Sequence, residues 1–135
     1  MLREGPIPPF AHGLLEYAAG VLLLVAPFLF AFDSDAATAF SIVAGLAVLA
    51  LAASTASSTG LAKVIPLGIH VLLDLAVVGL LVAAPFLFGF SGDAGPTAFF
   101  MVLGVWHLLL TIATRFRPPR IAEGARERSS ARPQE

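Results

Sequence analysis

Apolar residues fill four long stretches of the sequence, and the charged residues lie mostly between or after them. The stretches cover residues 12–32, 37–57, 67–90 and 97–114. A helix of about 20 residues rises about 30 Å, which matches the thickness of the hydrocarbon core of a bilayer. The pattern therefore predicts an all-α membrane protein with four transmembrane helices.

The first and third stretches resemble each other in sequence. HGLLEYAAGVLLLVAPFLFAF starts at His12 and HVLLDLAVVGLLVAAPFLFGF starts at His70, so the offset is 70 − 12 = 58 residues. Each has a carboxylate four residues after its His and an Ala-Pro-Phe-Leu-Phe segment near its end. This self-similarity predicts a two-helix unit used twice. Because each unit crosses the membrane twice, both copies enter it in the same direction, and we expect a parallel pseudo-twofold axis along the membrane normal.

The repeat divides the chain into five parts. Residues 1–11 contain three prolines and form an irregular N-terminal lead-in. The two-helix repeats occupy residues 12–57 and 67–114, joined by a cytoplasmic loop at 58–66. Residues 115–135 are polar and Pro-rich with six arginines, so we expect a disordered basic tail.

The charge distribution predicts the orientation. All eight Lys and Arg residues lie before the first helix, between the second and third, or after the fourth. The only charged residues in the loops on the other side are Asp33, Asp35 and Asp93. By the positive-inside rule, both termini face the cytoplasm. The composition agrees with a membrane location, since 58% of residues are hydrophobic and 13% are charged, against about 45–50% and about 25% in soluble domains.

Two local sequence features predict how the second helix begins and how it packs. Ser34 or Asp35 is suited to accept hydrogen bonds from the free N–H groups at its start. Ala37, Ser41 and Gly45 are small residues four apart, which let helix backbones approach closely in lipid. We predict that this stripe is a packing seam.

Pro27 and Pro85 stand inside the first and third helices. Each removes the hydrogen bond to the carbonyl four residues earlier, at Leu23 and Leu81, and we predict a kink at both.

Ionisable residues inside the predicted helices form the candidate functional site, and they are His12, Glu16, His70, Asp74 and His107. A carboxylate at the centre of a span costs about 2.5–3.5 kcal/mol, so we expect Glu16 and Asp74 to face protein or water. Interhelical hydrogen bonding that fixes how the repeats dock is one role. Proton handling and metal or haem binding are the others. Because no tight ligand motif is present, no metal ligand and no cofactor is assigned.

The His-x-x-x-acid start, Gly-rich centre and small-Pro-aromatic end resemble the SPW repeat family of small bacterial integral membrane proteins. The resemblance covers about residues 12–114 and is closest from Ile65 to Phe90. Both copies read Ala-Pro-Phe, at 26–28 and 84–86, where the family has Ser-Pro-Trp. The resemblance implies residence in the bacterial inner membrane and a duplicated four-helix unit, with no established activity.

The sequence has no nucleophile–base set, phosphate-binding loop or nucleic-acid signature, and it has no cysteine. We therefore expect a non-enzymatic membrane protein with a structural, accessory or assembly role. Its expected partners are the lipid bilayer and either another membrane protein or a second copy, and not nucleic acid. A proton or small-ion pathway is the alternative function, and a metal- or haem-binding protein is the second alternative.

Overall fold

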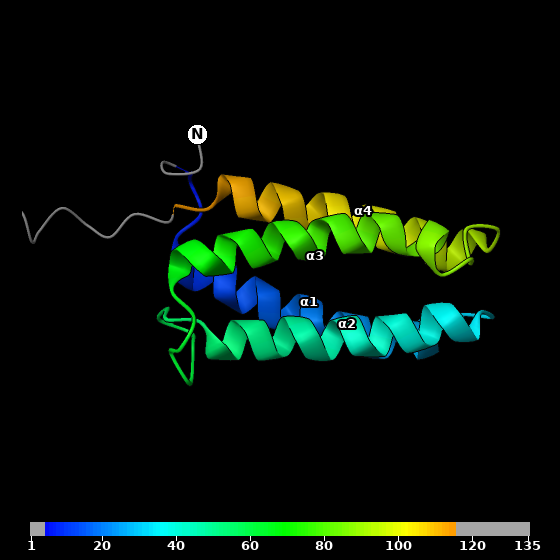
Figure 1. Cartoon of the computed structure of the whole chain (residues 1–135), viewed down its shortest axis with the longest axis horizontal. Coiled ribbons are helices and arrows are strands. Elements are labelled where there is room, and N and C mark those ends of the chain that lie inside the picture. The colour runs from blue at the N-terminus through cyan, green and yellow to red at the C-terminus, as the bar shows by residue number, and fades with distance from the viewer. Residues whose placement is uncertain (1–4, 116–135) are drawn as a thin grey trace, which may run out of the picture.

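The computed structural model describes residues 5–115, which form a bundle of four helices (Figure 1). The helices are α1 (Pro9–Leu29), α2 (Asp35–Ser54), α3 (Leu67–Leu87) and α4 (Ala94–Ala113). All four are long and apolar enough to cross a membrane, with mean hydropathies of 1.6, 2.2, 2.3 and 1.8. Within residues 5–115 the only β-structure is two isolated bridges. The prediction of an all-α protein with four membrane spans is confirmed.

The helix ends lie within three residues of their predicted positions. One shift of three residues is at the start of α1, which begins at Pro9 and not at His12. A proline at the first position of a helix loses no hydrogen bond, and its φ already suits the helix. Ser34 accepts a hydrogen bond from the backbone N–H of Ala37 at 3.2 Å, as predicted for the start of α2. The disordered tail is predicted for residues 115–135, of which residues 116–135 lie outside the described residues.

The helices pair as two hairpins, in which α1 packs mainly against α2 and α3 mainly against α4 (Figure 1). Small residues allow the first pair to approach closely. A Cβ atom added at Gly45 would lie 2.9 Å from the backbone oxygen of Gly20, and Ala37 and Ser41 are fully buried. The predicted packing seam on α2 therefore faces α1. The duplication of the hairpin and its pseudo-twofold axis stay predictions.

Both in-helix prolines lie in the last turn, two residues before the helix ends. Ser41 Oγ, from α2, donates a hydrogen bond to the backbone oxygen of Leu23 at 2.6 Å. That oxygen is the acceptor that Pro27 leaves without a helical donor. Phe100 holds the position in α4 that Ser41 holds in α2, and it has no hydroxyl. The kinks at Pro27 and Pro85 stay predictions.

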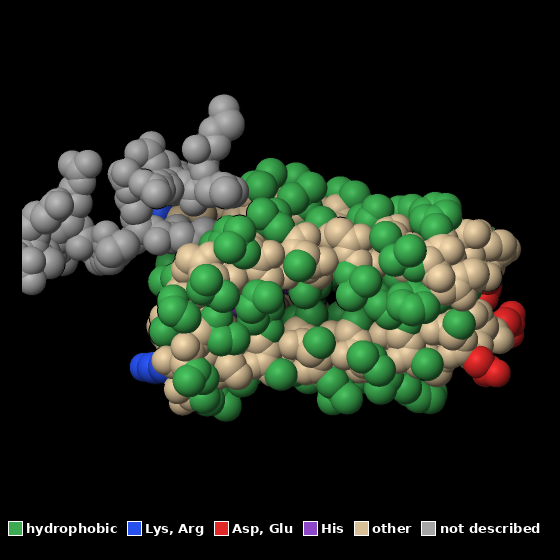
Figure 2. All heavy atoms as spheres, viewed as in Figure 1, with side chains coloured by type: hydrophobic (Ala, Val, Ile, Leu, Met, Phe, Trp, Pro, Cys, Tyr) green, Lys and Arg blue, Asp and Glu red, His purple; other side chains and the backbone are tan. Residues whose placement is uncertain are grey.

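An apolar core fills the middle of the bundle and the end that carries the α1–α2 and α3–α4 loops. Phe100 is fully buried, and the rings of Phe32, Phe40, Phe90 and Phe99 lie 5.1–6.2 Å from its ring. Hydrophobic side chains also cover the outside, as a lipid environment requires (Figure 2). In the same view, Lys and Arg gather at one end of the described bundle and Asp and Glu at the other.

The two hairpins are less tightly joined than the helices within each hairpin. A groove of about 770 Å³ lies between α1 and α4, and a second of about 390 Å³ lies between α2 and α3. Mostly apolar side chains line both grooves, which are open at the surface of the bundle. The contacts that hold the hairpins together are therefore concentrated in the core and in a polar cluster at one end.

Candidate functional site

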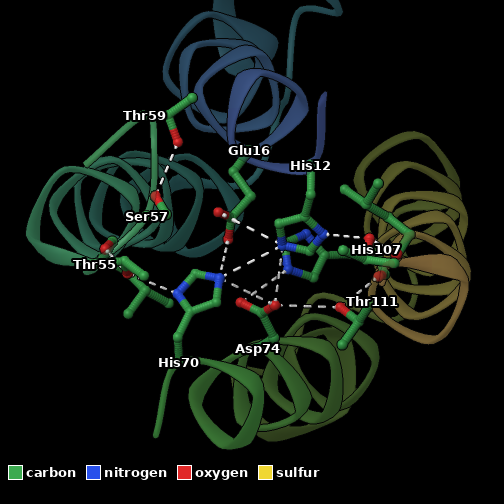
Figure 3. Close-up of polar contacts among 12 residues, drawn as sticks. His12, Glu16, Thr55, Ser57, Thr59, His70, Asp74, His107 and Thr111 are labelled. Carbon is green, nitrogen blue, oxygen red and sulfur yellow. Dashed lines mark hydrogen bonds and ion pairs between the residues drawn. The ribbon is translucent and has the colours of Figure 1, made fainter. Parts of the chain in front are cut away.

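All five predicted ionisable residues meet at one end of the bundle (Figure 3). We call them the polar cluster: His12 and Glu16 from α1, His70 and Asp74 from α3, and His107 from α4. None of them exposes more than 2% of its surface. Their placement follows from helical geometry, since residues four apart lie on one face of a helix. The faces of α1 and α3 that carry these pairs point toward each other.

The two hairpins share contacts at the centre of the polar cluster. His12 Nε2 lies 3.5 Å from His70 Nε2. Each nitrogen also faces the carboxylate of the other hairpin, with His12 Nε2 3.3 Å from Asp74 Oδ2 and His70 Nε2 3.3 Å from Glu16 Oε1. The carboxylate on the same helix is 3.6 Å away for His12 and 3.4 Å for His70. His12 and His70 therefore each have two carboxylate neighbours.

The imidazoles of His12 and His70 each contact one threonine on the side away from the centre of the polar cluster. Thr114 Oγ1 lies 2.8 Å from His12 Nδ1, and Thr55 Oγ1 lies 2.8 Å from His70 Nδ1. Each hydroxyl donates its hydrogen to the carbonyl four residues earlier, at 2.6 Å and 2.7 Å. Because a hydroxyl has a single hydrogen, both Nδ1 atoms must be the donors to the threonines. In the neutral rings, the lone pairs of both Nε2 atoms then point into the polar cluster.

The backbone at both threonines is fixed as well. Thr114 pairs with Ile7 and Thr55 pairs with Ile65 in two isolated parallel bridges. The segment just before α1 therefore runs alongside the end of α4, and the segment just before α3 runs alongside the end of α2. Sequence reasoning missed both threonines. The signal that could have revealed them is their shared place, since each is the first residue after the second helix of its hairpin.

His107 lies at the edge of the polar cluster. Its Nε2 is 3.7 Å from Asp74 Oδ1, and neither atom has a hydrogen-bond partner among the described residues. Glu16 Oε1 likewise has no hydrogen-bond partner there. Nearly all buried polar groups in folded proteins are hydrogen-bonded, so three buried polar atoms without a hydrogen-bond partner in one place are unusual. The polar cluster has more acceptor capacity than its donors satisfy.

The polar interior stops a short distance into the bundle. Beyond the polar cluster and its adjoining threonines (55, 111 and 114), Ser41 is the only buried polar side chain in residues 5–115. Leu23, Leu81 and Phe100 are buried next along the bundle and belong to the apolar core. The polar cluster is thus a buried group of ionisable side chains at one end of an apolar bundle.

Comparisons with known proteins give one match. The family model of the SPW repeat domain matches residues 10–114. No curated protein and no solved structure matches the chain.

Proposed function

The chain belongs to the SPW repeat domain family, and we propose that it is a non-enzymatic accessory protein of the bacterial inner membrane. In this proposal the polar cluster fixes the two helical hairpins against each other, and both termini lie in the cytoplasm. The observation that carries it is the complete burial of the polar cluster at one end of an otherwise apolar interior.

Burial of the polar cluster argues against catalysis. A general acid or base must come within about 3 Å of the group it serves, directly or through one water. With at most 2% of each residue exposed, a substrate from the water or the lipid has no route to these groups without opening the bundle.

The apolar core argues against a proton or ion pathway across the membrane. Such pathways need polar groups or water along the full span. Here Leu23, Leu81 and Phe100 are each at most 1% exposed and lie between the polar cluster and the opposite end.

The contacts between hairpins support a docking role. His12 reaches Asp74 and His70 reaches Glu16, so the shortest ion pairs of the polar cluster join α1 to α3. Each polar contact between helices in a membrane contributes only about 0.6 kcal/mol on average, yet it specifies which faces meet. The apolar grooves beside this contact leave fewer other interactions to set the docking.

The placement of charge supports the cytoplasmic orientation. Lys63 in the α2–α3 loop and Arg115 after α4 flank the end that holds the polar cluster. Asp33 and Asp93 lie in the loops at the other end. By the positive-inside rule, the polar cluster then faces the cytoplasmic leaflet. The partners of an accessory protein would be another membrane protein or a second copy.

The docking role is tested by spin labels on lipid-exposed positions of α1 and α4. Leu14 and Leu109 are 57% and 55% exposed, and because the chain has no cysteine, cysteines placed there label cleanly. In the Glu16→Gln Asp74→Asn variant we expect a broader distance distribution between the labels. Asp33→Asn Asp93→Asn makes the same charge change in the loops and is expected to leave the distribution narrow.

Two results would contradict the proposal. Equal distance distributions in the two double variants would show that the polar cluster does not fix the docking. Proton flux above the level of empty vesicles, in liposomes that contain the wild-type protein, would contradict a non-conducting accessory role.

A further inference from the structure

We propose that His12, Glu16, His70 and Asp74 form a tetrahedral binding site for one divalent transition-metal ion, with Zn²⁺ as the best match. This inference goes beyond the accessory role and does not depend on it. One ligand atom from each of the four residues lies within 4.8 Å of all the others, and all four residues are at least 98% buried.

The spacing of these atoms is the first argument. Four of these distances join one atom from each residue: the two His Nε2 atoms are 3.5 Å apart, Asp74 Oδ2 lies 3.3 and 3.4 Å from them, and Glu16 Oε1 lies 3.3 Å from His70 Nε2. His12 Nε2 lies 3.6 Å from the other oxygen of Glu16, Oε2. Ligands about 2.0–2.1 Å from a tetrahedral Zn²⁺ lie about 3.3–3.4 Å from one another. A hydrogen bond between a charged imidazole and a carboxylate is shorter, at about 2.7–2.9 Å. The four side chains are therefore spaced like the ligands of an ion and too widely for strong hydrogen bonds.

The orientation of the imidazoles is the second argument. Metal-binding histidines usually donate the N–H of the other ring nitrogen to an oxygen acceptor, which fixes the tautomer and aims the ring. Thr114 and Thr55 provide that acceptor for His12 and His70 at 2.8 Å each. The hydroxyls cannot donate in return, because each one donates to a backbone carbonyl. Both Nε2 lone pairs are thereby aimed at the same point.

Charge balance is the third argument. Two ionised carboxylates and two neutral imidazoles carry a net charge of −2, which is costly inside a membrane protein. A divalent cation makes the set neutral. Imidazole and carboxylate together suit Zn²⁺, which has no geometric preference of its own and accepts a tetrahedral site. Four protein ligands leave no open position, so we infer a structural ion rather than a catalytic one.

His107 has a different place in this site. Its Nε2 lies 3.7 Å from Asp74 Oδ1, while Asp74 Oδ2 faces His12 and His70. We assign it as a positioning residue that acts through Asp74, because it is the histidine that faces the carboxylate oxygen directed away from the ion. Ligating carboxylates are usually hydrogen-bonded themselves, and His107 Nε2 and Asp74 Oδ1 are two facing atoms that have no other partner among the described residues.

The test is a titration of the full chain, purified in detergent and stripped of metal with a chelator. Co²⁺ is the probe, because its visible absorption distinguishes tetrahedral from octahedral coordination, and Zn²⁺ is then added as a competitor. We expect one Co²⁺ per chain, a tetrahedral spectrum and complete displacement by Zn²⁺. An octahedral spectrum, or no saturable binding by a sample with a helical circular dichroism spectrum, would overturn the proposal.

A pair of variants distinguishes the loss of metal ligands from a general effect of lost negative charge. Glu16→Gln Asp74→Asn is expected to weaken Co²⁺ binding more than 100-fold, and Asp33→Asn Asp93→Asn is expected to leave it unchanged. Equal affinities in these two variants would overturn the proposal. Thr55→Val and Thr114→Val keep all four ligands, and we expect affinities about 10–100-fold lower at an unchanged stoichiometry. They keep the test decisive even where the carboxylate variant does not fold.

The outcome is separable from that of the accessory role. The spin-label distances are measured on the metal-stripped protein, so they report how the two hairpins dock against each other when no ion is bound. A failure of metal binding with narrow spin-label distances would reject the metal site alone.

Discussion

Gly45 is the residue at which a single added methyl group tests the packing of the first hairpin. A Cβ atom there would lie 2.9 Å from the backbone oxygen of Gly20, 3.0 Å from Leu24 Cγ and 3.1 Å from Leu23 Cβ. Since carbon contacts are optimal at about 3.5–4.0 Å, α1 and α2 would have to separate by about 0.5 Å or more. Overpacking of this kind costs about 1–3 kcal/mol.

Gly79 provides a matched control for this prediction. It lies in α3, where an added Cβ would meet nothing within 4 Å. Replacing glycine by alanine inside a helix stabilises it by about 0.5–1 kcal/mol through backbone entropy, and both variants share this gain. The difference between Gly45→Ala and Gly79→Ala therefore isolates the packing cost. We expect Gly45→Ala to be less stable than Gly79→Ala by about 1–3 kcal/mol.

The assay is equilibrium unfolding of the full chain in detergent micelles, followed by far-ultraviolet circular dichroism. Two variants that agree within about 0.5 kcal/mol would refute the close approach of α1 and α2 at this seam, because surface substitutions fall within that range.

Three further predictions concern the fold and its orientation. Ser41→Ala removes the donor to the Leu23 carbonyl and should lower the free energy of unfolding by about 0.6–1.7 kcal/mol in the same assay, whereas no loss would show that the bond contributes nothing. Phe100→Ala should lower it by about 3–5 kcal/mol, because it leaves a cavity in the core, and a loss under about 1 kcal/mol would contradict full burial. In intact cells, a membrane-impermeant thiol reagent should label Asp33→Cys and not Lys63→Cys, and the reverse pattern would reject the cytoplasmic placement of the polar cluster.

The four helices could be predicted from the sequence because an apolar run of about 20 residues has few stable forms in lipid. Every backbone polar group must be satisfied within the segment, and a helix does this. The exact ends were harder to predict. Apolar residues such as Phe30 continue past the end of α1, and Pro9, which suggests irregular structure, is also a good first residue for a helix.

The polar cluster could be predicted in its parts but not as a whole. The four-residue spacing of His12 and Glu16 places them on one face of a helix, and the repeat predicts the same for His70 and Asp74. That His12 meets His70 depends on how α1 faces α3 across the bundle, and a periodic pattern does not contain this information. Thr55 and Thr114 escaped notice because a hydroxyl at the end of an apolar run is an ordinary way to end a helix.

The separation of the polar cluster between two hairpins also has a consequence for biogenesis. His12 and Glu16 are synthesised 58 residues before His70 and Asp74. At a synthesis rate of about 5–20 residues per second, the polar residues of α3 are made about 3–12 s after those of α1. During that interval an acid and an imidazole of α1 are in the membrane without the groups that later surround them. A nascent chain that stalls before α3 is therefore marked by exposed polarity within the bilayer, which is a feature that quality-control proteases of the membrane can recognise.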